Sequence, residues 1–418
     1  MRRALASLVS RHRRLLAVLA VLGPGIIAAN AGNDAGGIAT YSSAGARYGY
    51  DLLWMMVVIT ISLVVVQEMA ARMGIVTGKG LADLVREQYG VRWALFATAS
   101  VLVANLGICI SEFVGIGAAL GLAHVPVAAS VPVAAVAVWL LLVRGTYKIA
   151  ERIFVAMTIP FFAYPIAAVL SHPHWGSVGK AIVAPHVQTS PAYVLLFVAT
   201  AGTTITPFMQ LYLQSAVVER GLGPEDLNKE RAEVVTGSIF ANLVASFIMI
   251  ATAAALFTHG HRIVNTASEA ARALTPFAGR FAEVLFAVGL LGASLLAAAV
   301  LPVTAAYVIS ETFGFERGVS RSPREAPVFV GVVTALVVIG AVVAMIPGIP
   351  VFRLLIGVQA VNGALLPITL FFVWRLSASA EVMGRYRNGR IFNVVAGATV
   401  LATSSLSVIL LAVTVLGL

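Results

Sequence analysis

Long apolar runs, separated by short polar or turn-rich breaks, repeat along the whole chain. A run of about 18 or more apolar residues can cross the roughly 30 Å of membrane hydrocarbon as one helix. The pattern predicts eleven membrane-spanning helices, over residues 15–47, 52–74, 93–122, 125–143, 149–170, 191–219, 232–258, 281–311, 327–346, 352–375 and 391–417. The connecting segments are too short to fold alone. We therefore expect an all-α polytopic membrane protein, with one transmembrane domain over residues 1–418.

The composition agrees with this pattern and excludes several classes of protein. Hydrophobic residues make up 60% of the chain and charged residues only 11%, whereas a soluble domain carries about 25% charged residues. Soluble enzymes, extracellular modules and disordered regulators are therefore excluded. The one cysteine, Cys109, excludes a disulfide framework and a cysteine-built metal cluster. The string TGKGLADL (77–84) lacks the spacing of a phosphate-binding loop, so we expect no nucleotide and no cofactor.

The distribution of basic residues predicts the orientation in the membrane. With the N-terminus in the cytoplasm, 22 of the 28 lysines and arginines lie on the cytoplasmic side of the predicted helices. The six on the outer side are Arg47, Lys180, Arg262, Arg272, Arg280 and Arg353. Because cytoplasmic loops are enriched in basic residues, this asymmetry predicts a cytoplasmic N-terminus and an extracytoplasmic C-terminus. The net charge of +10 thus describes the orientation in the bilayer and does not indicate nucleic-acid binding.

The first predicted span is interrupted at its middle. Residues 32–37 read GNDAGG, which places three glycines and the acid Asp34 inside an apolar helix. A glycine costs about 1 kcal/mol in a helix interior, and a charge at mid-membrane costs at least about 2.5 kcal/mol. Both costs at one place predict an unwound stretch in which Asp34 faces a polar cavity.

The sixth predicted span, 191–219, has a similar interruption. Residues 201–210 read AGTTITPFMQ. Pro207 removes a backbone hydrogen-bond donor from the middle of the helix, and Thr203, Thr206 and Gln210 lie close to it in sequence. The alternative for both spans is a simple kink, with Asp34 paired inside the helix bundle.

Interruptions in the first span of each of two five-helix halves are typical of inverted-repeat transporters, which bind substrate near the midplane. We expect a first repeat over about 15–170, an inverted second repeat over about 191–375 and an extra helix over about 391–417. Asp34, with carbonyl, hydroxyl and amide oxygens, would form an all-oxygen cation site. Such ligands suit magnesium, calcium or manganese.

Four segments resemble the Nramp family of divalent-metal transporters. They are GPGIIAANAGNDAGGIATYSSAGARYGYDLLW (23–54), ARMGIVTGKGLADLVREQYG (71–90), TITPFMQLYLQSAVV (204–218) and VMGRYRNGRIFNVVAG (382–397). They occur in the order that the family has them and are spread along most of the chain, from residue 23 to residue 397. The resemblance implies the LeuT-type five-plus-five inverted repeat with spans 1 and 6 unwound, plus one extra helix.

Two departures from the family pattern concern the metal site. Asp34 keeps the family's metal-binding acid, but Gly37 stands where the family has an asparagine ligand. Thr206 replaces the methionine that precedes the proline of the sixth span. A thioether favours transition metals over magnesium, and magnesium retains its waters. With their wider, sulfur-free site, these replacements resemble the Nramp-related magnesium transporter branch, and the resemblance implies transport of magnesium and manganese.

The resemblance also implies a set of metal ligands. Asp34 is the charged ligand, and Ala31 and Thr203 would contribute backbone carbonyls. Gly37 and Thr206 would line the enlarged space, and Gln359 in the tenth span would close on the ion. The sequence itself adds Gln210, which follows an insertion of one residue relative to the family motif and whose orientation stays open. Met209 is interpreted as a wall of the core or cavity.

Positions on the family's proton route change as well. Cys109 replaces an acid three residues before Glu112, and Phe208 replaces the histidine after the proline. Neither side chain relays protons near neutral pH. Glu112 is either a remnant of the relay or a packing acid bonded to a neighbour. We expect uptake of Mg²⁺ and Mn²⁺ across a bacterial cytoplasmic membrane without proton coupling.

Three alternatives remain at this stage. One is a proton-coupled Mn²⁺/Fe²⁺ importer of the ordinary Nramp type. Another is an intramembrane enzyme that uses Asp34 as a catalytic acid, although aspartyl catalysis of this kind requires two paired acids. The third is an amino-acid permease of the same fold. The expected partners are the metal ion and the lipid bilayer. The oligomeric state is left open, with a monomer expected.

Overall fold

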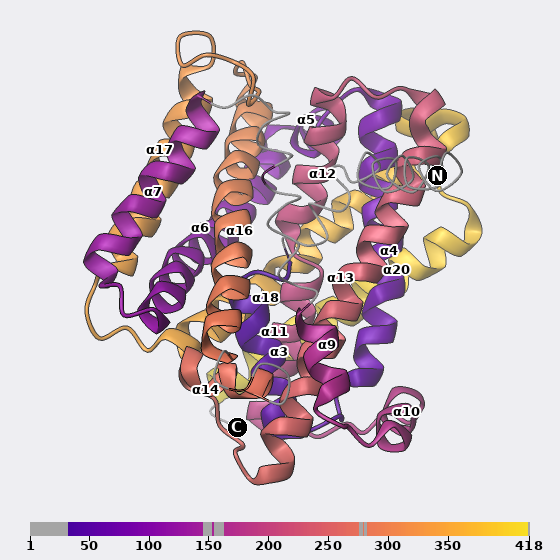
Figure 1. Cartoon of the computed structure of the whole chain (residues 1–418). Coiled ribbons are helices and arrows are strands. Elements are labelled where there is room, and N and C mark those ends of the chain that lie inside the picture. The colour runs from indigo at the N-terminus through magenta and orange to yellow at the C-terminus, as the bar shows by residue number, and fades with distance from the viewer. Residues whose placement is uncertain (1–31, 145–152, 154–162, 276–278, 280–281, 417–418) are drawn as a thin grey trace, which may run out of the picture.

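A computed structural model describes residues 32–144, 153, 163–275, 279 and 282–416, and every regular element in these ranges is a helix (Figure 1). The α-helices are α3 (Ala35–Tyr48), α4 (Leu53–Thr77), α5 (Leu81–Tyr89), α6 (Val91–Leu122), α7 (Val127–Arg144), α9 (Ala163–Leu170), α10 (Trp175–Val183), α11 (Pro191–Thr204), α12 (Pro207–Glu219), α13 (Leu227–Ala255), α14 (Ala267–Ala271), α16 (Ala282–Phe313), α17 (Pro327–Ala344), α18 (Val351–Ala378), α19 (Ala380–Met383) and α20 (Arg390–Leu416). The all-α fold class predicted from the sequence is confirmed.

Nine segments of the described residues are long and apolar enough to cross a membrane, and α11 and α12 together form one of them. They match nine of the predicted spans, with bounds that differ by a few residues. The predicted spans 15–47 and 149–170 lie partly outside the described residues. Their described parts contain α3 and α9. The total of eleven therefore stays a prediction.

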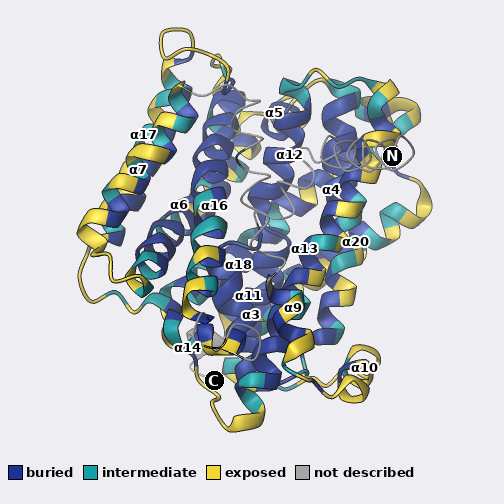
Figure 2. Ribbon diagram, viewed as in Figure 1, coloured by how far each residue is buried: buried dark blue, intermediate teal, exposed yellow. Residues whose placement is uncertain are grey.

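The exposed surface carries apolar side chains where a soluble protein would carry charges. Figure 2 shows α3, α11, α12 and α18 buried in the interior, whereas α7, α17 and α20 present exposed faces. Val133 of α7 is 69% exposed and Leu401 of α20 is 70% exposed. A continuous apolar surface of this kind marks contact with another apolar phase. These faces are suited to lipid.

The predicted interruption of the first span is present on its α3 side, where the described residues begin at Gly32. Residues 32–34 are not helical, and α3 begins at Ala35. We had placed Gly36 and Gly37 in the unwound stretch, and this was wrong, since both form the first turn of α3. The reason is local: Asp34 caps α3, so the helix starts directly after the acid.

The interruption of the sixth span is confirmed and is confined to two residues. Ile205 follows α11, and Thr206 has an extended backbone (φ −85°, ψ 145°) directly before α12. Pro207 is the first residue of α12, a position at which its missing N–H costs no intrahelical hydrogen bond. Thr203, which we expected in the break, lies in the last turn of α11.

The two interrupted spans lie side by side in the middle of the molecule, where α3 and α11 pack against each other and against α18 (Figure 1). The crossing of α11 and α18 is close because glycines face each other. A methyl group on Gly202 would lie 2.6 Å from Cα of Gly363, and one on Gly363 would lie 2.6 Å from the Val198 carbonyl oxygen. Small residues permit such crossings in membranes.

At the opposite end of the sixth span, α12 is tied to two other helices. The sequence predicted a loop over 75–92, whereas residues 81–89 form the short helix α5 with a buried apolar face. The buried Glu311 of α16 accepts hydrogen bonds from the Ala82 amide (3.3 Å) and the Ser215 hydroxyl (2.7 Å). Gln214 of α12 donates to the Lys79 carbonyl (2.9 Å). These bonds join α5, α12 and α16.

The close crossing generates a prediction. Replacement of Gly363 by alanine should lower the midpoint of thermal unfolding, because the added methyl group forces α18 away from the Val198 carbonyl. Gly357→Ala in the same helix is the matched control, since nothing lies within 4 Å of its added methyl group and alanine favours helix by about 1 kcal/mol. Thermal unfolding of the detergent-solubilised chain measures both. Equal midpoints for the two variants would contradict the close packing.

Candidate metal-binding site

Asp34 is held at the start of α3. Its side-chain Oδ1 accepts a hydrogen bond from the Gly37 amide (2.5 Å), and its own carbonyl accepts one from the Ile38 amide (2.9 Å). Asp34 is 0% exposed. An acid in this position satisfies an otherwise unpaired amide and interacts favourably with the positive end of the helix dipole. The carboxylate is therefore stabilised where the bilayer would otherwise disfavour it.

Gln359 of α18 completes the hydrogen bonding of Asp34. Its amide nitrogen donates to both carboxylate oxygens, each at 2.9 Å. Its amide oxygen accepts from Asn362 (3.3 Å), which also donates to the Gly202 carbonyl of α11 (2.7 Å). A chain of hydrogen bonds thus connects Asp34, α18 and the last turns of α11. The structure thus places Gln359 against Asp34, and its expected closure on the ion stays a prediction.

Oxygen atoms from both interrupted spans meet beside Gly37. The Thr203 hydroxyl donates to the Gly32 carbonyl (3.2 Å). A methyl group on Gly37 would lie 2.7 Å from that carbonyl oxygen, 2.9 Å from the Thr203 hydroxyl and 3.3 Å from Oδ1 of Asp34. The space that an asparagine would fill is thus occupied here by oxygens. Gly37 permits a close approach of three oxygens, where we had expected it to open a wider cavity.

Thr206 and Gln210 lie on the other side of the sixth-span break. Both are fully buried, and the Thr206 hydroxyl has no hydrogen-bond partner among the described residues. The Gln210 amide nitrogen, in the orientation that satisfies its neighbours, donates to the carbonyls of Thr206 and Pro207 (3.1 Å to the latter). No hydrogen bond among the described residues joins Thr206 or Gln210 to Asp34. Ala31 lies outside the described residues, so its carbonyl role stays a prediction.

Glu112 has a role that the sequence left open. Its Oε2 accepts a hydrogen bond from the Ala35 amide (3.1 Å), and Oε1 accepts one from the Ser111 hydroxyl (3.1 Å). Two carboxylates, those of Asp34 and Glu112, therefore satisfy the first amides of α3. The amides at a helix start lack partners within the helix, but Glu112 lies two spans further along the chain than α3. No local signal in the sequence could have predicted this contact.

The surroundings of the site supply neutral ligands. Within the described ranges, no group of three or more histidine, cysteine, aspartate or glutamate side chains could hold a metal ion. The Met209 sulfur contacts the Gln67 amide of α4 (3.7 Å), which supports its interpretation as part of the core. The Tyr41 and Thr204 hydroxyls share a hydrogen bond (2.9 Å) that links α3 to α11. A cation at Asp34 would meet one carboxylate and neutral oxygens.

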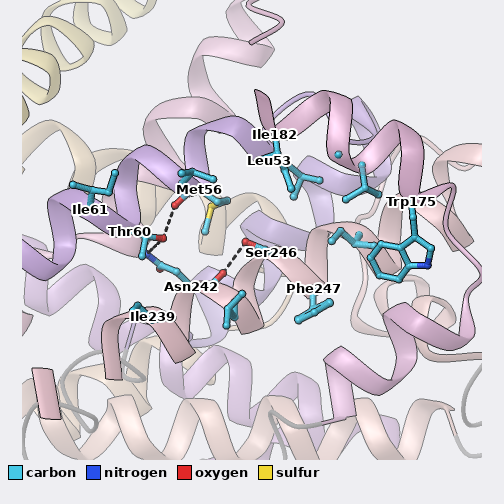
Figure 3. A pocket seen from close by; sticks show the side chains of 15 residues that line it. Leu53, Met56, Thr60, Ile61, Trp175, Ile182, Ile239, Asn242, Ser246 and Phe247 are labelled. Atoms are coloured by element: carbon cyan, nitrogen blue, oxygen red, sulfur yellow. Dashed lines mark hydrogen bonds between the residues drawn. The ribbon is translucent and has the colours of Figure 1, made fainter. Parts of the chain in front are cut away.

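A mainly apolar groove lies apart from this site. Figure 3 shows it between α4, α10 and α13, lined by residues such as Met56, Trp175 and Phe247. Asn242 lies at its floor and donates to the Thr60 hydroxyl (2.9 Å), which joins α13 to α4. This groove has almost no polar lining, so it offers no ligands for a cation.

The fold, with its two interrupted helices, defines a class: helical membrane transporters, which bind substrate between discontinuous helices. Comparison with known proteins gives the family. The family profile described as "Natural resistance-associated macrophage protein-like" matches residues 25–413. The chain belongs to this family, the Nramp family of multi-pass membrane transporters. Because the family consists of transporters, the alternative of an intramembrane enzyme is excluded.

Individual relatives agree with this assignment. The chain is 31% identical over 405 residues to the divalent metal cation transporter MntH of Ralstonia nicotianae, a match that covers 91% of this chain and 87% of the relative. It is 29% identical over 397 residues to the protein of the same name from Deinococcus radiodurans. This match covers 90% of this chain and 86% of the relative.

Solved structures confirm the predicted LeuT-type fold. A manganese transporter of Eremococcus coleocola, crystallised with an aromatic bis-isothiourea compound, has a TM-score of 0.74 at 21% identity, over 95% of this chain and 87% of that one. MhsT in complex with L-phenylalanine has a TM-score of 0.61 at 12% identity, over 93% and 97%. At these identities the likeness concerns the fold alone.

The position of Glu112 generates a prediction. Glu112→Ala should lower the thermal midpoint, because a buried amide without its acceptor costs about 1–3 kcal/mol. Glu112→Gln should recover most of the loss, since its amide oxygen can accept the same bond from Ala35. Glu283→Ala, at an exposed acid of α16, is the control for loss of a glutamate. A glutamine variant as unstable as the alanine variant would show that the charge itself is required.

Proposed function

We propose that this chain takes up divalent metal ions, Mg²⁺ and Mn²⁺, across the cytoplasmic membrane of a bacterium by alternating access and without proton coupling. One observation carries the proposal. Asp34, a fully buried acid where the two interrupted spans meet, lies beside the neutral oxygens of the Gly32 carbonyl and the Thr203 hydroxyl. Hard oxygen ligands suit Mg²⁺ and Mn²⁺.

Binding of the ion requires a small rearrangement at Gln359. Its amide nitrogen now faces both oxygens of Asp34, which a cation would also use. Rotation of the amide by half a turn would present its oxygen to the ion. The Gly32 carbonyl and the Thr203 hydroxyl lie next to the carboxylate. The remaining ligands in this proposal are the carbonyls of Ala31 and Thr203 and waters that the ion keeps, as Mg²⁺ prefers.

Transport follows from access to this site from one side at a time. Asp34, Thr203 and Gln359 are all 0% exposed in this structure, so the site is closed. Movement of the α3 and α11 halves would open one path, and movement of α12 the other, as in other transporters built from interrupted helices. A divalent ion gains about 4.6 kcal/mol from a membrane potential of 100 mV, inside negative. This energy suffices for uptake without a second ion.

The residues near the site support transport without proton coupling. Cys109 is buried and directs its thiol to the Leu336 carbonyl (3.5 Å). Phe208 is buried and apolar. The Glu112 carboxylate accepts hydrogen bonds from the Ala35 amide of α3 and from the Ser111 hydroxyl. None of these arrangements forms a chain of groups that exchange protons with Asp34.

The second candidate is a proton-coupled importer of Mn²⁺ or Fe²⁺. It is favoured by the relatives, which are named for divalent metal cations, and by the fold neighbour, which is a manganese transporter. The two candidates differ in two measurable properties, the acceptance of Mg²⁺ and the movement of protons.

Uptake into proteoliposomes decides between them. With the membrane potential clamped, we expect Mg²⁺ and Mn²⁺ to compete for uptake and the internal pH to stay constant. Asp34→Asn should reduce uptake by about tenfold or more, because neutral oxygens alone bind these ions weakly. Asp51→Asn, at an acid outside the site, is the matched control. A failure of Mg²⁺ to compete, or acidification that follows metal entry, would favour the second candidate.

Metal selectivity provides a separate prediction. Thr206→Met introduces the thioether of the family pattern and should raise the preference for Mn²⁺ over Mg²⁺ by about tenfold, because sulfur binds the softer ion better. The Thr206 hydroxyl has no partner, so the substitution breaks no hydrogen bond among the described residues. Thr206→Val is the control for loss of the hydroxyl. An unchanged ratio of uptake rates in Thr206→Met would place Thr206 outside the ion path.

The orientation is tested by labelling single cysteines in intact cells. Lys180 and Arg385 are both exposed and lie at predicted outer and cytoplasmic ends respectively. We expect a membrane-impermeant maleimide to label Lys180→Cys and to leave Arg385→Cys unlabelled until the cells are broken. The native Cys109 is fully buried, so its background should be low. The opposite labelling pattern would reverse the proposed topology.

A further inference from the structure

We propose that a pocket at the predicted outer face binds an oxyanion of the phosphate type. The pocket has a volume of about 490 Å³ and lies between the C-terminal end of α3, the first turns of α11 and α18, and the segment 262–265. Arg47, Arg262 and Arg353 line it, and none of its described lining residues is acidic. We call it the arginine pocket.

The three arginines lack ionic partners. Among the described residues, no ion pair includes Arg47, Arg262 or Arg353, whereas arginines at the opposite end of the molecule pair with acids. The Arg47 guanidinium lies 5.8 Å from the ring centre of Tyr48, and that of Arg262 lies 4.4 Å from the ring centre of Phe257. Stacking on a ring leaves the N–H groups at the edge of a guanidinium free to donate. Three positive groups therefore line one pocket without an ion-pair partner among the described residues, and the nearby Glu269 carboxylate is bonded to the Asn265 amide (2.7 Å).

A buried hydroxyl points to a ligand independently. Ser43 lines the arginine pocket and is only 8% exposed, and its hydroxyl has no hydrogen-bond partner among the described residues. A buried polar atom without a partner is costly. An oxyanion in the pocket would accept a hydrogen bond from this hydroxyl as well as from the guanidinium groups.

Two helix starts add to the positive potential. Ala192 in the first turn of α11 and Phe352 in the first turn of α18 both line the arginine pocket. The amides of a first turn have no intrahelical partners and carry the positive end of the helix dipole, which favours anions. Guanidinium groups bind phosphate oxygens in pairs of parallel hydrogen bonds. Together these groups fit a phosphate oxyanion, either free or as the headgroup of an anionic lipid.

The place of the arginine pocket suggests what a bound anion would do, and this step depends on the proposed function. The pocket lies at the ends of α3, α11 and α18, which also carry Asp34, Thr203 and Gln359. Along α3 the distance from Arg47 to Asp34 is about 20 Å. A divalent cation on its way to Asp34 from this side is repelled by three uncompensated arginines. A bound oxyanion offsets their charge and should accelerate uptake.

Binding is tested on the full-length chain in detergent, without divalent metal, by calorimetric titration. The two probes are inorganic phosphate and short-chain phosphatidylglycerol. We expect the double variant Arg262→Gln/Arg353→Gln to bind about tenfold more weakly or worse, since each charged hydrogen bond lost weakens binding by about that factor. The double variant Lys180→Gln/Arg272→Gln is the matched control, because it removes two basic residues of the same face that do not line the pocket.

The outcomes separate as follows. Weaker binding in the pocket variant alone supports the proposal, and the probe that binds identifies the source as free phosphate or as a lipid headgroup. Equal affinity in the pocket and control variants would overturn it, as would the absence of binding of either probe at about 10 mM. Since this assay contains no transported metal, a failure leaves the proposed function intact.

A second measurement tests the effect on transport. In phosphatidylcholine vesicles at constant free Mn²⁺, the probe that bound should raise the initial rate of uptake severalfold in the wild type and in the control variant. In the pocket variant, the rate should already be high without the probe, because two repelling charges are gone. If the uptake rate is the same with and without the probe, and the same in the wild type and the pocket variant, the proposed effect on transport is overturned.

Discussion

The structure depends on one constraint: a carboxylate in the middle of an apolar bundle must have its oxygens satisfied. Asp34 meets it by starting a helix with its own side chain, through the Gly37 amide, and by accepting two hydrogen bonds from Gln359. The first condition interrupts the span at the acid. The second fixes the position of α18. An unpaired charge at this depth would cost several kcal/mol. The start of α3 and the position of α18 are therefore both fixed by Asp34.

The close helix crossings follow from the same constraint. For Gln359 to reach Asp34 while Asn362 reaches the Gly202 carbonyl, α18 must approach α11 more closely than ordinary side chains permit. Gly202 and Gly363 provide that approach. In the bilayer, apolar contact alone gives little preference for one neighbouring helix over another, so packing of small residues and hydrogen bonds determine the arrangement. The buried polar groups thus act as the specific contacts of the bundle.

Much of this architecture could be predicted from the sequence, and the limits have physical causes. The spans follow from runs of apolar residues, and the two breaks follow from Asp34 and Pro207, because these are local features. The bounds of the first break were wrong at Gly36 and Gly37, since a capping acid lets glycines join a helix. The contact of Gln359 with Asp34 crosses 325 positions, and only a family resemblance could anticipate it. The role of Glu112 depends on a tertiary contact with Ala35 that no local pattern encodes.

The interruption between α11 and α12 has a mechanical consequence. The α11 half is bonded to α3 and α18 through Thr204 and Gly202. The α12 half is bonded to Lys79, just before α5, through Gln214 and to Glu311 of α16 through Ser215. The two halves of one span therefore have different hydrogen-bond partners, and the non-helical residues Ile205 and Thr206 lie between them. A rotation of α11 relative to α12 would therefore be taken up by the backbone torsions of these two residues, which form a hinge within the span.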